Sequence, residues 1–155
     1  RHLAVGAKVA YQQPYSQSYV GQGDGTLTDG RCGGWSYGDG CWQGFMQRRD
    51  TAVAPFDITL DMGAEKRFTT VSLDFMQSDG AWVYYPKAVT ISISTDGEHF
   101  EPIYNKEYAR QRLNVVGTRT VSFQSKKKLQ ARFIRITARE DNPGEWAFTD
   151  EVKVF

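Results

Sequence analysis

Apolar and polar residues alternate along several short segments of the chain, a pattern that predicts β-strands with one buried face. These segments are Phe56-Ile58-Leu60, Val71-Leu73-Phe75, Val89-Ile91-Ile93, Val121-Phe123, Ile134-Ile136 and Val152-Val154. Turn signals separate them, at Asp61-Met62-Gly63, Ser78-Asp79-Gly80, Thr95-Asp96-Gly97 and Asn142-Pro143-Gly144. No window keeps helical spacing for three turns. We therefore expect an all-β, antiparallel β-sandwich of the jelly-roll type, with no helix longer than about three turns.

The first third of the chain has a different character. From about Tyr11 to Asp50 the sequence is rich in Gly, Gln, Ser and Tyr and shows little alternation. Disordered segments are poor in aromatic residues, so this composition favours an ordered long loop, and long loops in compact domains are usually functional. A length of 155 residues suits one domain, and no repeat or linker divides it, so we expect a single domain over 1–155.

The charge balance argues against a nucleic-acid partner. Nineteen Lys and Arg against eighteen Asp and Glu give a net charge of +1, too little to attract a polyanion over long range. The basic run Lys126-Lys127-Lys128 is interpreted as a solvated turn between two strands. No apolar segment approaches the roughly 18 residues of a membrane helix, so we expect no membrane insertion, and we expect a monomer.

Residues for catalysis are scarce. His2 lies at the terminus, and His99 lies in an expected hairpin, with no nucleophile motif near either. The run from Gly21 to Gly25 lacks the strand and helix that a phosphate-binding loop requires. We therefore expect the chain not to be an enzyme, although paired carboxylates meeting in a cleft could hydrolyse a glycoside.

Two cysteines, Cys32 and Cys41, lie within a Gly-rich stretch. The flexible segment between them permits a local disulfide, and two free thiols are the alternative. Two such ligands alone are too few for a structural zinc site.

A set of short motifs in a fixed order resembles a known family along nearly the whole chain. The motifs are Leu3-Ala4-Val5-Gly6, Leu27-Thr28-Asp29-Gly30, Trp35, Trp42, Ile58 to Gly63, Ser94-Thr95-Asp96-Gly97, Ala131 to Ile136 and Glu151-Val152. Together they resemble the coagulation-factor V/VIII C-type (discoidin) domain and, within it, the family 32 carbohydrate-binding modules. The run from Gly33 to Phe45 is similar to the C-terminal module of bacterial, Bacteroides-type family 20 β-hexosaminidases (chitobiases).

This resemblance implies an eight-stranded, galactose-binding-domain-like jelly roll with its ligand loops at one end. It implies a carbohydrate partner, a parent catalytic domain of the glycosidase type and a secreted, periplasmic or cell-surface location in a bacterium. Because family members also bind lipids or proteins, the fold alone does not identify the ligand. The competing hypothesis is an interaction module that packs against a catalytic domain or another protein without binding free sugar.

Sugar recognition needs a flat ring that stacks on a pyranose and a few polar groups that read its hydroxyls. Trp82 and Trp146 lie in expected loops and are candidates for stacking, with packing over the sandwich end as the alternative for each. Further candidates for ligand contact are Tyr37, Asp39 and Tyr84, and with less support Tyr15, Tyr19, Arg48, Arg49 and Asp50. For Trp35 and Trp42, the resemblance implies packing.

A calcium ion is expected near the turn from Asp24 to Gly30. Calcium takes six to eight oxygen ligands and often combines carboxylates with backbone carbonyls from Gly-containing turns. The resemblance implies an ion held by Asp29 and Glu151, with carbonyl oxygens near Asp24 and Thr26. The alternative is a hydrogen-bonded turn with solvated carboxylates.

Overall fold

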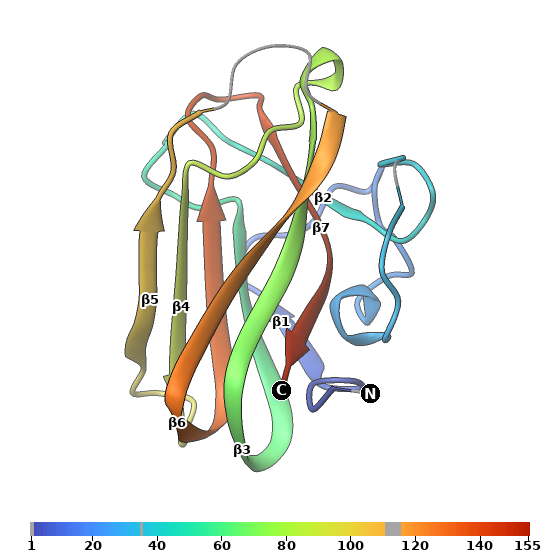
Figure 1. Cartoon of the computed structure of the whole chain (residues 1–155). Coiled ribbons are helices and arrows are strands. Elements are labelled where there is room, and N and C mark those ends of the chain that lie inside the picture. Colours follow the sequence, from blue (N-terminus) through green and yellow to red (C-terminus); the bar gives the residue numbers. More distant parts are fainter. Residues whose placement is uncertain (1, 35, 111–115) are drawn as a thin grey trace.

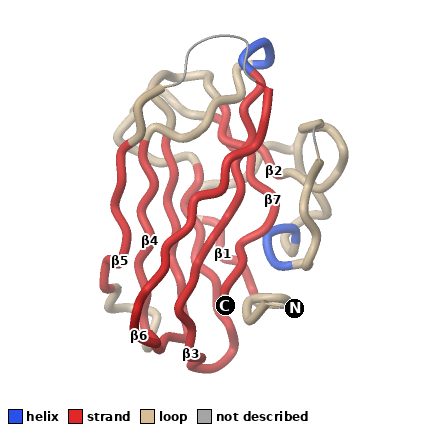
Figure 2. The backbone as a smooth tube through the Cα atoms, viewed as in Figure 1, coloured by secondary structure: helices blue, strands red, loops and turns tan. Residues whose placement is uncertain are grey.

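β-strands account for nearly all regular structure in the computed structural model of the chain, which describes residues 2–34, 36–110 and 116–155. The strands are β1 (Lys8–Tyr11), β2 (Gln43–Met46), β3 (Phe56–Ser78), β4 (Ala88–Ser94), β5 (Glu101–Glu107), β6 (Val116–Arg139) and β7 (Trp146–Val154). Two 3-10 helices of three residues each, η1 (Thr26–Thr28) and η2 (Asp79–Ala81), complete the elements of these residues (Figure 2). The expected all-β class and the absence of long helices are confirmed for this part of the chain.

The two longest strands, β3 and β6, connect the two layers of the fold. They pair antiparallel from Phe56 opposite Ala138 to Ser78 opposite Val116. Register shifts interrupt the pairing between Asp61 and Lys66, near the predicted turn, where Gly63 has a φ of 84° that favours glycine. Figure 1 shows both strands turning at the lower end of the molecule, so that each contributes one half to each layer. The segments predicted as separate strands on either side of these turns are thus continuous.

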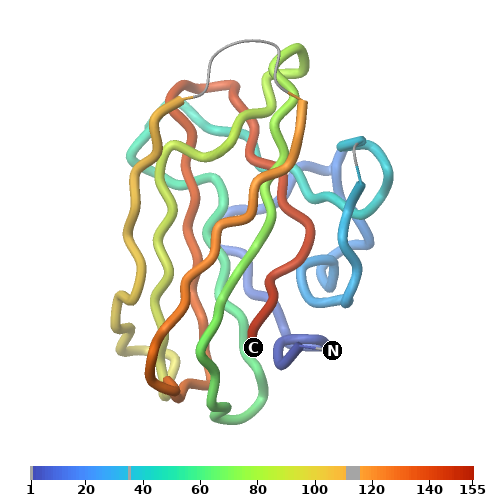
Figure 3. Tube along the Cα trace, in the orientation of Figure 1, coloured from blue at the N-terminus to red at the C-terminus, as the bar shows by residue number. Residues whose placement is uncertain are grey.

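All strand pairs are antiparallel, and they form a sandwich. One layer contains β1, the first half of β3, the second half of β6, β4 and β5. The other contains β2, β7, the second half of β3 and the first half of β6. The long segment between β1 and β2 lies beside this second layer, as the trace in Figure 3 shows. The expected β-sandwich is confirmed.

Two apolar clusters stabilise the sandwich. The larger one is buried between the layers and includes Phe45, Phe56, Phe75 and the alternating residues of the predicted strands. The smaller one contains Trp42, Met76, Val83 and Phe148. Because neighbouring residues in a strand point to opposite faces, Phe75 and Met76 place the smaller cluster on the outer face of the second layer. The expected packing role of Trp42, only 1% exposed, is confirmed, whereas Trp35 lies outside the described residues.

Two further expectations concern the thiols and the membrane. Cys32 and Cys41 are both free, so the local disulfide that the sequence permits is not formed. Within the part of the chain that the structure describes, no helix has the length and apolar character of a membrane span.

Candidate functional site

Among the residues that the structure describes, Trp82 is the most exposed large aromatic residue at the upper end of the sandwich. It ends η2, and 61% of its surface is accessible. Its φ is 63°, in the left-handed region that bulky residues rarely adopt. Two backbone hydrogen bonds between Ser78 and Val83 close the loop, and the Trp82 amide donates to the Asp79 carbonyl at 3.0 Å. The surrounding loop therefore holds a strained residue with its indole in solvent.

Trp82 and Trp146 lie side by side, although Trp146, expected in a loop, is the first residue of β7. The Trp146 amide donates to the Trp82 carbonyl at 2.8 Å, and the Tyr84 amide donates to the Trp146 carbonyl at 3.0 Å. Trp82 and Trp146 nevertheless differ in burial, because Trp146 is half-buried. The backbone thus brings both residues to one pole but exposes the first indole far more than the second.

The ring of Trp146 packs within the smaller aromatic cluster. Its centroid lies 5.3 Å from that of Tyr19 and 5.9 Å from that of Phe148. Tyr37 joins the same cluster, 5.6 Å from Phe148. The pairing between β3 and β7 contains a register shift between Leu73 and Phe75, which lets Phe148 face this cluster while Val152 faces the core.

A cavity of about 220 Å³ opens beside Trp146. The described residues that line it are Gln13, Pro14, Tyr15, Ser16, Met46, Arg48, Pro55 and Trp146. Sequence reasoning named Tyr15 and Arg48 among its weaker candidates and missed Met46, whose side chain is 46% exposed. No sequence signal identifies Met46, because a strand residue is buried or exposed according to what covers its face.

The carboxylate of Asp39 stabilises the loop in which it lies. One oxygen accepts a hydrogen bond from the Gly34 amide and the other from the Cys41 amide, each at 2.8 Å. The side chain therefore has a structural task that the sequence did not predict, and it fixes the segment that carries Tyr37.

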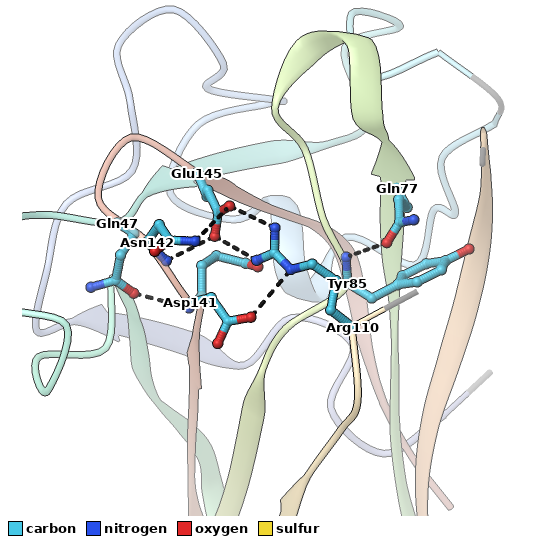
Figure 4. Close-up of polar contacts among 8 residues, drawn as sticks. Gln47, Gln77, Tyr85, Arg110, Asp141, Asn142 and Glu145 are labelled. Carbon is cyan, nitrogen blue, oxygen red and sulfur yellow. Dashed lines mark hydrogen bonds and ion pairs between the residues drawn. The ribbon is translucent and has the colours of Figure 1, made fainter. Parts of the chain in front are cut away.

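Tyr84 belongs to a charged network at the same pole. The guanidinium of Arg110 lies over its ring, 4.1 Å from the centroid. Arg110 also donates two hydrogen bonds of 2.6 Å to Glu145 and one of 3.2 Å to Asp141 (Figure 4). Burial opposes ionisation of Glu145, but the hydrogen bonds from Arg110 lower its pKa below the usual value. Sequence reasoning missed Arg110 and Glu145, since residues so far apart in the chain form no motif.

Two buried side chains, those of Gln47 and Glu140, lie next to this network. The Gln47 amide nitrogen donates to the Val53 carbonyl at 3.0 Å. The Gln47 amide oxygen accepts from the Glu140 amide at 2.9 Å (Figure 4). The Glu140 carboxyl is fully buried, and neither of its oxygens has a hydrogen-bond partner among the described residues. Burial, and then the charge of Glu145, raise the pKa of Glu140 well above its usual value.

Of the four expected calcium ligands, the structure brings Asp29 and Glu151 together. Burial first, and then the charge of Asp29, raise the pKa of Glu151 to about 8. Its Oε2 accepts from the Gly30 amide at 2.8 Å and contacts His2 Nε2 at 2.7 Å. Its Oε1 is buried without a partner in the described part of the chain. Such an orphaned carboxylate oxygen beside a second carboxylate fits a cation.

Asp24 and Thr26 are engaged elsewhere. The Asp24 carboxylate accepts a hydrogen bond of 2.6 Å from the Tyr15 hydroxyl, and its carbonyl accepts one of 3.0 Å from Tyr11. The Thr26 hydroxyl donates to the Gly23 carbonyl at 2.6 Å. Both side chains therefore stabilise the turn that precedes Asp29, and the expected binding of an ion by carbonyl oxygens near Asp24 and Thr26 stays a prediction.

A second group of metal-ligating atoms lies near this turn. Ligand atoms of Cys32, Asp74 and Asp150 lie within 4.8 Å of one another. A hydrogen bond to Cys32 raises the pKa of Lys153, whose ammonium group also feels both carboxylates. A cation of the protein itself, Lys153, thus already offsets part of the negative charge of this group.

Comparison with known proteins places the chain among domains of one type. Residues 12–152 match the family described as F5/8 type C domain. No curated protein sequence matches the chain.

Solved structures share the fold at low sequence identity. Chitosan-binding module 1 of a chitosanase/glucanase from Paenibacillus has a TM-score of 0.67 and 13% identity, and the match covers 100% of this chain and 98% of that one. A CBM32 module from a family 31 glycoside hydrolase of Clostridium perfringens gives 0.66 and 15%, covering 100% and 97%. Another Clostridium perfringens CBM32 module, in complex with GalNAc-β-1,3-galactose, gives 0.63 and 16%, covering 100% and 99%.

Proposed function

The chain belongs to the F5/8 type C domain family, and on this premise we propose that it is a non-catalytic carbohydrate-binding module. Its ligand is a terminal N-acetylglucosamine, N-acetylgalactosamine or galactose unit. The observation that carries the proposal is the exposed indole of Trp82, held in a strained backbone conformation at the loop end of the sandwich. Strain of this kind persists where the surrounding structure enforces it, often at ligand sites.

The recognition follows from simple contacts. The apolar face of the sugar ring stacks on the Trp82 indole, and polar groups of the neighbouring loops bind its hydroxyls. Such a small ligand gains at most about 0.3–1.5 kcal/mol per heavy atom, so we expect dissociation constants between about micromolar and millimolar. Weak binding of this kind suffices to keep an attached enzyme near its substrate, because it raises the effective concentration.

We further propose a parent chain of the β-hexosaminidase or chitobiase type and a secreted, periplasmic or surface location in a bacterium, with the domain itself monomeric. The supporting features are the run from Gly33 to Phe45 and the glycoside-hydrolase origin of the structural neighbour from family 31. The domain would direct the enzyme to glycan, and the chemistry would reside in the parent.

The direct test is titration of the chain with galactose and the two N-acetylhexosamines. Trp82→Ala should abolish most of the binding while the protein stays folded. Phe155→Ala is the matched control, because Phe155 is another exposed aromatic residue but lies at the C-terminus, away from the upper loops (Figure 1). Equal affinity of the Trp82 variant and the wild type for all three sugars would refute the site.

A second candidate function has an observation in its favour. Trp82, Met46, Val53 and Val116 are all exposed apolar residues in or next to the upper loops. Exposed apolar patches also mark protein interfaces, so this end could pack against a catalytic domain. Self-association of the chain in sedimentation velocity, abolished by Met46→Ser and unaffected by sugar, would support this alternative over sugar binding.

We also propose a structural calcium ion bound by Asp29 and Glu151. The buried, unpartnered Oε1 of Glu151 supports the proposal, since a cation would satisfy it. A ligand that binds only the native state raises the melting temperature by mass action. Excess chelator should therefore lower the melting temperature, and Asp29→Asn should remove most of that difference. An unchanged melting curve in chelator would refute the ion.

A further inference from the structure

The group formed by Cys32, Asp74 and Asp150 lies where the long segment between β1 and β2 meets strands β3 and β7. The three side chains come from three separate parts of the chain, yet their ligand atoms all lie within 4.8 Å of one another. One thiol and two carboxylates are ligand types that zinc accepts. We infer that these three residues bind a divalent transition metal ion of the zinc type. The inference goes beyond the proposed function, because sugar binding does not require this ion and the site shares no ligand with the proposed calcium site.

An irregularity in the sheet brings the two carboxylates together. The pairing of β3 with β7 shifts register between Leu73 and Phe75. Two residues of β7, Asp150 and Glu151, therefore oppose the single residue Asp74, and such a bulge often re-aims side chains at functional sites. Like charges side by side across a sheet are destabilising, and Asp150 is only 1% exposed, so water screens little of the repulsion. A metal ion between the carboxylates would remove this cost.

Backbone hydrogen bonds hold Asp150 and the segment of Cys32 in place. The Gly33 amide donates to Asp150 Oδ2 at 2.8 Å, and the Glu151 amide donates to Asp150 Oδ1 at 2.7 Å. Gly33 also packs against Trp42, whose Nε1 would lie 2.0 Å from a Cβ atom at that position. The residue next to Cys32 is thus fixed on β7 before an ion arrives, and such preorganisation favours binding. Each Asp150 oxygen keeps a second lone pair for the metal.

The charges of the group balance when a dication is bound. Without a metal, the Lys153 ammonium group faces the carboxylates of Asp74 and Asp150, so one negative charge of these three groups is left over. A zinc ion binds the thiolate of Cys32, whose proton is released to solvent. The three anionic ligands then match the two charges of the ion and the one charge of Lys153. The hydrogen bond between Lys153 and Cys32 would persist as an outer contact that favours the thiolate.

The geometry requires only small side-chain movements. Tetrahedral zinc, with Zn–S of about 2.3 Å and Zn–O of about 2.0–2.2 Å, places its ligand atoms roughly 3.3–3.7 Å apart. Since the ligand atoms here already lie within 4.8 Å, shifts of about 1 Å bring all three to the ion. Water completes the tetrahedron, because Cys32 is exposed. Calcium does not suit this group, since it takes six to eight oxygen ligands and thiolates select softer ions.

The test uses Co²⁺ as a spectroscopic probe for the zinc-type ion, added to the whole chain with its thiols reduced. A cysteine thiolate bound to Co²⁺ gives a charge-transfer band in the near ultraviolet, and we expect one ion per chain, displaced by Zn²⁺. Cys32→Ser should abolish the band. Cys41→Ser is the matched control, because it removes the other free thiol of the same segment and should leave the band unchanged. Asp74→Asn and Asp150→Asn should each weaken Co²⁺ binding by at least about tenfold.

Several outcomes would refute the site. One is the absence of the band with Co²⁺ in excess, and another is its loss in Cys41→Ser. Wild-type affinity in Asp74→Asn would mean adventitious binding to an exposed thiol only, and this variant decides the question even if Asp150→Asn fails to fold. Displacement of Co²⁺ by excess Ca²⁺ would assign the ion to the pair of Asp29 and Glu151 and would also refute the separate site. None of these results bears on sugar binding, which the Trp82 variants test.

Discussion

Replacing Trp82 by glycine and by alanine separates its backbone strain from its role in binding. The residue has a φ of 63° and an indole that is 61% exposed. A left-handed conformation costs a residue with a Cβ atom about 1–2 kcal/mol, and glycine avoids this cost. The greater freedom of glycine in the unfolded chain costs about 0.4–1 kcal/mol in return. We therefore expect Trp82→Gly to be more stable than Trp82→Ala by about 1 kcal/mol.

The same pair of variants should lose sugar binding equally, since neither has a ring. Urea unfolding gives the stabilities, and in a thermal scan the glycine variant should melt about 2–4 °C above the alanine variant. Trp42→Ala serves as the contrast, because truncating a buried tryptophan costs roughly 3–5 kcal/mol. A glycine variant no more stable than the alanine variant would refute the strain argument. A loss of 3 kcal/mol or more in Trp82→Ala would mean that the indole packs, and would refute its role as an exposed stacking surface.

Three further predictions concern charged groups. Glu140→Gln should be more stable than the wild type, and urea unfolding should show that this difference grows from pH 5 to pH 8. Because the pKa of Glu140 is raised, the folded protein keeps a proton that the unfolded chain releases, and the stability of the wild type therefore falls as pH rises. The hydrogen bond that the His99 ring donates to the Asp96 carboxylate raises the pKa of His99, so an NMR titration should give a value above 6.5 that Asp96→Asn returns to about 6.5. Arg110→Ala leaves the nearly buried Glu145 unpaired and should lower the free energy of unfolding in urea by about 2 kcal/mol. This is less than the roughly 3–5 kcal/mol for breaking a fully buried pair, because the Arg110 side chain is 27% exposed. An unchanged unfolding midpoint would contradict this prediction.

Sequence analysis missed three strands, and in two of them, β2 and β5, burial does not alternate simply, whereas β1 alternates but has only four residues. In β2, the residues Gln43, Gly44 and Phe45 are all buried, because the strand lies between the core and the loop that covers its outer face. In β5, most residues from Glu101 to Glu107 are exposed, since it pairs only with β4 at the edge of the sheet. Period-two alternation is a reliable signal only where one face of a strand is buried and the other is in water.

The sequence alone determined the two-layer, all-β character of this chain and most of its core, because alternation and turn residues are local properties that the backbone obeys wherever the strands finally pack. It also placed Trp82 in a loop, whereas Trp146, likewise expected in a loop, is the first residue of β7. The family resemblance named Asp29 and Glu151 as the carboxylates of the proposed calcium site. Only the tertiary structure decided that Trp82 is exposed while Trp146 packs against Tyr19, since exposure depends on which distant segment covers a residue. The pairing of Arg110 with Glu145 was likewise decided there, because contacts between loops follow from how the strands bring their ends together.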